Sequence, residues 1–200
     1  MCSAVDSSSA DIVVLTETWL SSCVKNFEIF CCEKSFKVYR CDRGERTGGG
    51  VLIAIASHIE SFCVRLSSEL EITWVCLHLN YQKLILGVCY RPPSNNHSFV
   101  TSLHDAINSL LMRFPSVPII LLGDFNYPNI VWTGLHAYSH PFSSDATEFI
   151  NLCNDFSFSQ LMTLPTRITQ TTANILDLIL TTSPFLISSI STKQGISDHS

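Results

Sequence analysis

Two polar residues, Asp124 and Asn126, directly follow an apolar run, and this spacing gives them chemical possibilities. The run 117–122 has the length and composition of a buried strand, and Gly123-Asp124-Phe125-Asn126 comes next. Open sheets bind ligands beyond the ends of their strands, so a carboxylate and a carboxamide here could hold a water, a metal ion or a phosphate. Asp and Asn also favour turns, and an Asx-turn that closes the strand explains the pair equally well.

Further polar residues stand at or near the ends of predicted strands. Glu17 follows the apolar segment 11–16, and Asp177 interrupts the apolar segment 175–180. A carboxylate between apolar neighbours is costly to bury without a partner, and a histidine such as His199 is a natural one, because the Asp fixes its tautomer. Each residue alone has a structural explanation. Together they match phosphodiester hydrolysis, which needs oxygen ligands for Mg²⁺, an aligned water and stabilisation of negative charge.

The elements that must position these residues are mostly strands. Period-two or continuous apolar patterns predict strands over 11–16, 36–40, 51–55, 62–66, 71–79, 83–90, 117–122, 175–181 and 185–190. Apolar residues with a 3.6-residue period predict a helix over 99–114, and Asp145 with Glu148 forms a capping-box-like start for a second. There is no regular alternation of strand and helix, so the predicted class is α+β, a layered sandwich.

Composition narrows the class of protein. An apolar content of 46% with 14% charged residues excludes disorder and predicts a substantial core. No apolar run approaches the ~20 residues that span a membrane, and no signal peptide is recognisable, so we expect a soluble, intracellular protein. The nine cysteines include no Cys-x2-Cys pair, which disfavours zinc. The net charge of −5 does not indicate nucleic-acid binding, although five basic residues over 34–46 could meet phosphates or simply solvate a loop.

Six motifs in order carry a family resemblance. They are Thr16-Glu17-Thr18-Trp19, Gly48-Gly49-Gly50-Val51, Tyr90-Arg91-Pro92-Pro93, Gly123-Asp124-Phe125-Asn126, Leu176-Asp177 and Ser197-Asp198-His199. With them the chain, from Asp11 to His199, resembles the endonuclease/exonuclease/phosphatase superfamily, and more narrowly the apurinic-type endonuclease domain of non-LTR (LINE-type) retrotransposons. The resemblance implies a four-layer αββα (DNase I-like) sandwich with the site at one rim of two packed sheets. It also implies a Mg²⁺-dependent (or Mn²⁺-dependent) nuclear endonuclease that nicks DNA, joined in the full-length protein to a reverse transcriptase domain.

The resemblance also implies catalytic roles. Asp124 would orient or deprotonate the attacking water, and Asn126 would hold nucleophile or phosphate oxygens. His199 would contact the scissile phosphate, with Asp177 orienting its ring. Tyr90 would offer its phenol to the phosphate.

Metal and substrate contacts are implied in the same way. Glu17 and Asp198 would lie at the metal, whereas Arg91 and Thr166 would join Asn126 in contacting the substrate. Gly48-Gly49-Gly50 is not a phosphate cradle of the Walker type, because no Lys-Ser/Thr follows it. We expect it to be a loop that enters a strand.

Two departures from the family concern the ends of the chain. The family has a strand with a metal-binding Asn upstream of the Glu17 strand and a closing strand after the Asp-His motif. We therefore expect a single, partial domain over 1–200 that lacks both strands, with 1–10 as a non-homologous or disordered start. Two other functions stay open: a phosphomonoesterase or phosphoinositide phosphatase of the same fold, and a non-catalytic remnant or interaction module.

Overall fold

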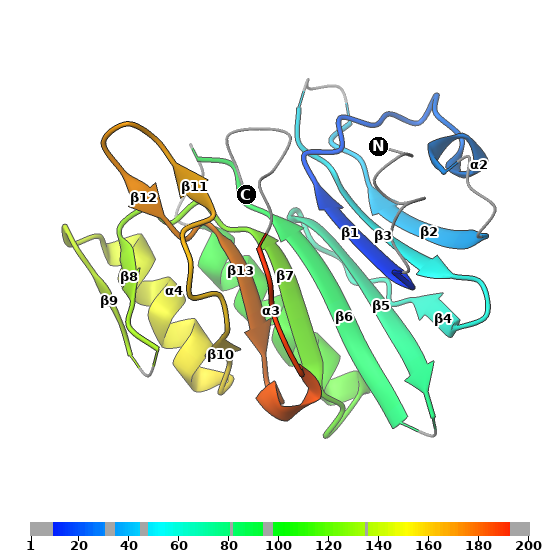
Figure 1. Ribbon diagram of the computed structural model, residues 1–200. Coiled ribbons are helices and arrows are strands. Elements are labelled where there is room, and N and C mark those ends of the chain that lie inside the picture. The colour runs from blue at the N-terminus through cyan, green and yellow to red at the C-terminus, as the bar shows by residue number, and fades with distance from the viewer. Residues whose placement is uncertain are drawn as a thin grey trace.

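Two β-sheets packed face to face form the centre of the protein (Figure 1). The computed structural model describes residues 10–30, 35–44, 48–80, 82–93, 98–134 and 136–192. Within these residues the larger sheet has six strands in the order β10-β13-β7-β6-β5-β4, and the smaller has three in the order β1-β3-β2. The strands of the larger sheet are β4 (Glu60–Cys63), β5 (Glu71–Leu79), β6 (Gln82–Tyr90), β7 (Ile119–Asp124), β10 (Ser159–Gln160) and β13 (Asp177–Thr181). Those of the smaller sheet are β1 (Ile12–Thr16), β2 (Phe36–Cys41) and β3 (Val51–Ala56).

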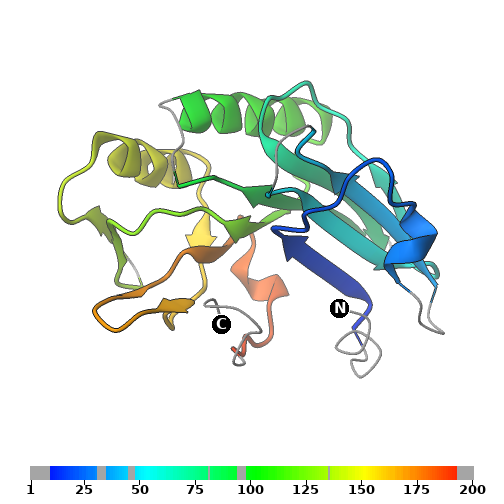
Figure 2. The same ribbon diagram turned by 90° about the horizontal axis from the view of Figure 1, so that it is seen from above.

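Helices cover the outer faces of both sheets, so the order of layers is helix, sheet, sheet, helix (Figure 2). The two long helices, α3 (Ser98–Arg113) and α4 (Ser144–Asp155), pack on the larger sheet. On the smaller sheet, the helix α2 (Asn26–Ile29) has only four residues and buries Ile29 against Leu52 and Ala54. The expected α+β sandwich is confirmed, with a thin helical layer on the side of the smaller sheet.

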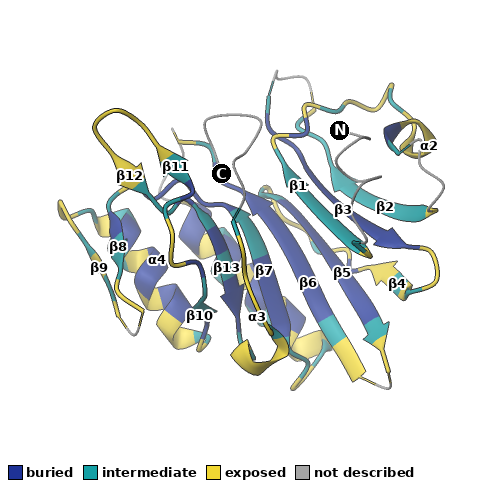
Figure 3. Ribbon diagram, in the orientation of Figure 1, coloured by how far each residue is buried: buried dark blue, intermediate teal, exposed yellow. Residues whose placement is uncertain are grey.

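β3 is buried throughout, whereas β5 and β6 are each buried over six successive residues (Figure 3). One face of β5 and β6 fills the apolar core between the sheets, and the other packs under the long helices. All six residues of β3 are buried, since β3 lies between β1 and β2 and is covered on both faces. Its inward side chains Val51, Ile53 and Ile55 pack against residues of β5 and β6 such as Val75 and Val88. A rigid double layer of this kind can hold rim residues of both sheets at fixed separations.

The strand β7 lies parallel to β6, and α3 makes the crossover that a parallel pair requires. The buried side of α3 follows the predicted helical period. At the end of β7, Gly123 has a φ of +143°, and a Cβ added there would lie 1.8 Å from the carbonyl oxygen of Cys89. Glycine at this position therefore lets β7 approach β6 closely, immediately before Asp124.

Two small hairpins extend from the larger sheet on the side of α4. The first pairs β8 (Ile130–Trp132) with β9 (Ala137–Ser139), and the second pairs β11 (Arg167–Ile168) with β12 (Ala173–Asn174). The sequence patterns predicted neither hairpin. Each strand has only two or three residues, which is too short to show a recognisable alternation.

One predicted strand is wrong. The segment 185–190 alternates weakly, but Pro184–Leu186 forms the 3₁₀-helix η1, and the residues that follow are not in a strand. Pro184 stands at the first helical position, where its fixed φ favours a turn and its missing N–H costs nothing. The predicted strand 62–66 is displaced, because β4 ends at Cys63.

The start of α4 also differs from the prediction. Ser143, and not Asp145, is the N-cap residue, and its hydroxyl accepts a hydrogen bond from the Ala146 N–H at 3.4 Å. We expect Ser143→Ala to lower the free energy of unfolding by about 1 kcal/mol, because the cap is lost. Glu148→Gln, which would remove the acid of the predicted capping box, should have little effect since this residue is exposed. Urea denaturation of both variants checks this, and the reverse order of effects would contradict it.

No helix in the described part of the chain is long and apolar enough to cross a membrane. Six described cysteines are free thiols; Cys76, Cys89 and Cys153 are buried, and Cys23 and Cys63 are exposed. Burial raises the pKa of the Cys153 thiol to about 12, so this core cysteine is protonated at neutral pH.

Candidate functional site

A row of polar side chains crosses the larger sheet at one end of four neighbouring strands. Glu71 pairs with Tyr90, Tyr90 with Asp124, and Asp124 with Asp177. Residues paired directly across strands project from the same face of a sheet, and Tyr90 belongs to the core between the sheets. The row therefore lies along the rim that faces the smaller sheet.

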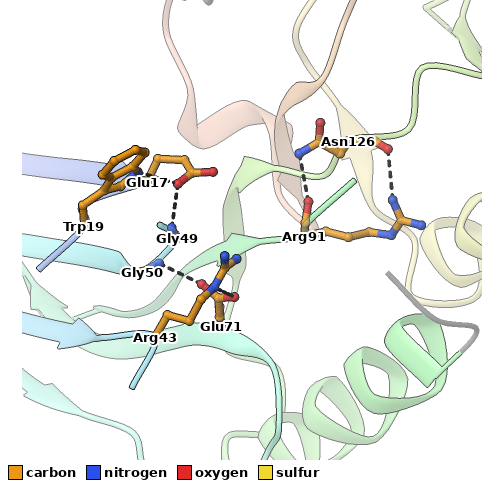
Figure 4. A network of polar contacts seen from close by, with 8 residues as sticks. All are labelled: Glu17, Trp19, Arg43, Gly49, Gly50, Glu71, Arg91 and Asn126. Carbon is orange, nitrogen blue, oxygen red and sulfur yellow. Dashed lines mark hydrogen bonds and ion pairs between the residues drawn. The ribbon is translucent and has the colours of Figure 1, made fainter. Parts of the chain in front are cut away.

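Glu17 meets this row from the smaller sheet. It follows β1 directly, and the backbone N–H groups of Thr18 and Trp19 continue the pairing by donating to the carbonyls of Gly50 and Gly49. Its Oε2 accepts hydrogen bonds from the Trp19 indole at 2.8 Å and from the Gly49 N–H at 2.6 Å (Figure 4). The Tyr90 phenol lies close enough to the Glu17 carboxylate to lower the pKa of Glu17, so side chains of the two sheets meet here.

The backbone around Glu17 is held in an unusual conformation. Glu17 has a φ of 51° and Trp19 a φ of 54°, which is uncommon for residues with side chains. Such conformations persist only where the surroundings hold them, and they concentrate at functional sites. The Trp19 side chain is nevertheless 67% exposed, so its anchor is the hydrogen bond to Glu17 and not burial.

Ionisation at the rim follows from these contacts. Partial burial by itself raises the pKa of Glu17, but hydrogen bonds from Tyr90, Gly49 and Trp19 and the charge of Arg43 outweigh it, so the pKa is lowered. Burial, followed by the hydrogen bond to Glu17 and its charge, raises the pKa of Tyr90 well above its ordinary value. At neutral pH the rim therefore presents an anionic Glu17 and a protonated phenol.

The loop after β7 contains the turn predicted from its sequence. Asp124 accepts a hydrogen bond from the Asn126 N–H at 3.0 Å, which is an Asx-turn. Asp124 is 5% exposed and Asn126 is 8% exposed with a φ of 49°. The turn and the rim site are thus compatible, because the turn itself fixes Asn126 beside Asp124.

Arg91 fixes the Asn126 loop through hydrogen bonds that run in both directions between the two residues. Its Nη1 donates to the Asn126 carbonyl at 3.0 Å, and the Asn126 amide donates to the Arg91 carbonyl at 2.8 Å (Figure 4). Its Nη2 pairs with Asp145 at 2.5 Å, and the guanidinium lies over the Tyr127 ring, 4.0 Å from the centroid. The guanidinium is 6% exposed and directed at protein groups, so its predicted contact with substrate stays a prediction.

Thr166 is likewise directed inward. It is 1% exposed, and its hydroxyl accepts hydrogen bonds from the N–H groups of Leu176 and Asp177, both at 3.0 Å. This contact fixes the first residue of β13 and thereby Asp177. A substrate contact by Thr166 also stays a prediction.

Asp198 and His199 lie outside the described residues. Among those that the structure describes, no group of three or more His, Cys, Asp or Glu side chains could hold a metal ion. The carboxylates of Glu17 and Asp124 are hard oxygen donors, and Mg²⁺ commonly takes only one or two carboxylates together with waters and substrate phosphates. The donor set at the rim therefore fits a hard divalent cation.

Two rim residues were missed from the sequence. Glu71 was predicted only as the start of a strand, and Arg43 only as part of a basic segment. Arg43 Nε donates to Glu71 Oε1 at 2.6 Å, and the Arg43 guanidinium lies 5.3 Å from the centre of the Tyr90 ring. Glu71 could have been found by counting back from the Asn80 turn, since the pairing of Leu79 with Gln82 puts Glu71 opposite Tyr90.

Solved structures share this fold at low sequence identity. The endonuclease domain of TRAS1, a telomere-specific non-LTR retrotransposon, matches with a TM-score of 0.63 and 14% identity over 88% of this chain and 74% of that chain. The Xenopus laevis APE2 catalytic domain matches with a TM-score of 0.60 and 16% identity over 90% and 76%. The Bacteroides thetaiotaomicron mannosyl-6-phosphatase Bt3783 matches with a TM-score of 0.53 and 13% identity over 86% and 70%.

No protein with a curated description matches the sequence. A family model described as "Endonuclease-reverse transcriptase" matches residues 84–200, which is more than half of the chain. The match includes the segments of Tyr90, Asp124, Asn126 and Asp177. The chain belongs to this endonuclease-reverse transcriptase family, within the endonuclease/exonuclease/phosphatase superfamily.

Proposed function

We propose that the chain is a metal-dependent phosphodiesterase that nicks duplex DNA. It would be the endonuclease part of a non-LTR retrotransposon protein, with the reverse transcriptase domain of the same element as its partner. The family match and the fold shared with the TRAS1 endonuclease domain support this proposal. This function would require entry to the nucleus, where the target DNA lies.

The proposal depends on one observation, which is that polar residues at the rim of the smaller sheet lie beside those at the rim of the larger sheet. Glu17 from the smaller sheet lies beside the Tyr90 phenol of the larger, which lowers the pKa of Glu17. Tyr90 pairs in register with Asp124, and Asp124 pairs with Asp177. Hydrolysis of a phosphodiester needs an anionic metal ligand, a group that handles the attacking water and donors for the phosphate oxygens. The rim offers a residue of the right type for each task.

In the proposed mechanism, Glu17 and Asp198 would hold Mg²⁺ or Mn²⁺, and the metal would neutralise charge on the phosphate oxygens. Asp124 would orient the attacking water and accept its proton. As the water oxygen bonds to phosphorus, the bond from phosphorus to one sugar oxygen would break, and that oxygen would leave as a hydroxyl after taking a proton from solvent. One N–H of the Asn126 amide already donates to the Arg91 carbonyl, so its second N–H would donate to the reacting oxygens, and the protonated Tyr90 phenol would turn from Glu17 to do the same. Asp177 orients His199 towards the scissile phosphate.

The remaining predicted contacts concern substrate binding. Arg91 and Thr166 hold the backbone on which Asn126 and Asp177 stand. Their contribution to substrate binding would then be indirect, through the placement of those residues. A duplex substrate would approach along the rim where the two sheets meet.

A second candidate is a phosphomonoesterase with the same site. It is favoured by the shared fold with the mannosyl-6-phosphatase, since the superfamily fold alone does not select the phosphoester. In that case a small phosphomonoester would be hydrolysed and duplex DNA would stay intact. A non-catalytic interaction module is the third possibility.

The purified chain should convert supercoiled plasmid to nicked circles in Mg²⁺ or Mn²⁺, and EDTA should stop the reaction until metal is restored. Phosphate release from p-nitrophenyl phosphate, measured in parallel, should be negligible. Phosphate release without nicking would favour the monoesterase. Inactivity on both substrates, with no shift of thermal unfolding by either metal, would contradict both catalytic proposals.

A further inference from the structure

Hydrogen bonds and close side-chain contacts around Glu17 form a ring, and this ring includes Glu71 and Arg43, which have no role in the proposed mechanism. Gly49 N–H donates to Glu17 at 2.6 Å, and Gly50 N–H donates to Glu71 Oε2 at 2.7 Å. Glu71 Oε1 accepts from Arg43 Nε, and the Arg43 guanidinium lies over Tyr90. Tyr90 closes the ring, because its phenol acts on the Glu17 carboxylate and lowers the pKa of Glu17. Figure 4 shows the part of the ring that Glu17, Gly49, Gly50, Glu71 and Arg43 form.

The glycine loop, residues 48–50, has a backbone conformation and a lack of side chains that allow the ring to form. Gly48, Gly49 and Gly50 have φ values of +89°, +68° and +85°, which side chains rarely allow. A Cβ at Gly49 would lie 2.4 Å from Arg43 Cζ and from Glu71 Oε2. The Arg43–Glu71 pair therefore lies directly on the loop, and the loop has no side chains to displace it.

Two successive backbone N–H groups of the loop each donate a hydrogen bond to a carboxylate, one from each sheet. Glu17 follows β1 of the smaller sheet, whereas Glu71 begins β5 of the larger. Because Gly49 and Gly50 are adjacent, the position of the Gly50 amide on Glu71 determines where the Gly49 amide meets Glu17. The Arg43–Glu71 pair thus fixes the position of Glu17 relative to Tyr90 and to the polar residues that pair with Tyr90.

The ring also determines which part of Glu17 can bind a ligand. Its Oε2 already receives the Trp19 indole and the Gly49 amide. Such donors orient the carboxylate and fix its second oxygen, which is the arrangement that outer hydrogen bonds give to metal-binding carboxylates. Arg43 and Glu71 are only 23% and 16% exposed, so solvent does little to loosen them.

We propose that Glu71 and Arg43 are positioning residues that set the affinity of the Glu17 site for a divalent cation. This inference rests on the proposed function, because it requires that Glu17 binds metal. The pair acts through the glycine loop and touches neither the metal nor the substrate. Its loss should weaken metal binding while leaving the fold intact.

The test measures Mn²⁺ binding by electron paramagnetic resonance of the free ion, without any assay of activity. Glu71→Gln keeps an oxygen that accepts from the Gly50 N–H but loses the negative charge of the ion pair. Arg43→Met removes the positively charged member of the same pair. Both should raise the Kd for Mn²⁺ by about 10–100-fold, the usual effect of losing an outer partner of a metal ligand. Arg43→Lys keeps the charge and should restore much of the affinity.

Asp42→Asn is the matched control. The carboxylate of Asp42 pairs with Arg40 at 3.4 Å, with side chains that are 18% and 14% exposed. The Asp42 backbone lies beside Gly50, but among the described residues its carboxylate accepts no hydrogen bond from the glycine loop. This variant should bind Mn²⁺ as the wild type does. Every variant should still unfold cooperatively in EDTA at a temperature well above that of the binding measurement. If the wild type binds Mn²⁺ and both pair variants bind it equally well, the inference is wrong and the proposed function stands. If the wild type binds no Mn²⁺, the proposed function fails and the inference with it.

Discussion

Replacing Asp124 with Asn is expected to lower the rate of metal-dependent nicking by about 10²–10⁴-fold, the usual contribution of a general acid–base residue. Asn keeps the size of the side chain and an oxygen that accepts the Asn126 N–H, so the Asx-turn should survive. What is lost is the negative charge that would draw the proton from the attacking water. The expected loss is therefore chemical and not structural.

The measurement is the initial rate of conversion of supercoiled plasmid in Mg²⁺, compared at equal protein concentration. Asp155→Asn is the control, because Asp155 is an exposed aspartate at the end of α4 and should nick at the wild-type rate. The folded state of both variants is checked by thermal unfolding in EDTA. Nicking by Asp124→Asn at the wild-type rate would exclude Asp124 from the chemistry.

Much of the fold could be predicted because the core strands have strong patterns. The strand 71–79 was predicted with the observed bounds, and β1, β3 and β6 differ by only a residue at one end. β3, β5 and β6 are buried over long continuous stretches, where the apolar pattern dominates every other signal, and β1 is half-buried beside β3. The wrong predictions lie at the surface, in the short hairpins and in η1. There, turn-forming residues and local capping determine the backbone conformation.

The site was predictable in its types of residue but not in its connections. The sequence indicated that Glu17, Tyr90, Asp124 and Asp177 stand at strand ends, yet only the pairing of strands aligns the last three in one row. Glu71 and Arg43 carry no motif, and their importance depends on a loop from one sheet reaching a strand of the other. Contacts of this kind between distant segments leave no local signal in a single sequence.

Replacing Arg91 with Met is expected to lower the free energy of unfolding by about 3–5 kcal/mol, the usual result when one member of a buried ion pair is removed. Asp145 would keep its charge at a site only 16% exposed, and the Asn126 carbonyl would lose its donor. Urea denaturation measures the effect. Arg113→Met, at the exposed end of α3, is the control and should change stability by less than about 0.5 kcal/mol.

The double variant Arg91→Met/Asp145→Leu separates the two roles of Arg91. Apolar side chains of similar size often replace a buried pair at little cost, so the double variant should be clearly more stable than Arg91→Met alone. It still lacks the hydrogen bond that holds the Asn126 carbonyl, and Asn126 must keep a φ of 49° to stay beside Asp124. We therefore expect a recovered fold with nicking that stays well below the wild-type rate. Full recovery of nicking with stability would show that Arg91 contributes only to folding, and that the Asx-turn at Asp124 is sufficient to fix Asn126.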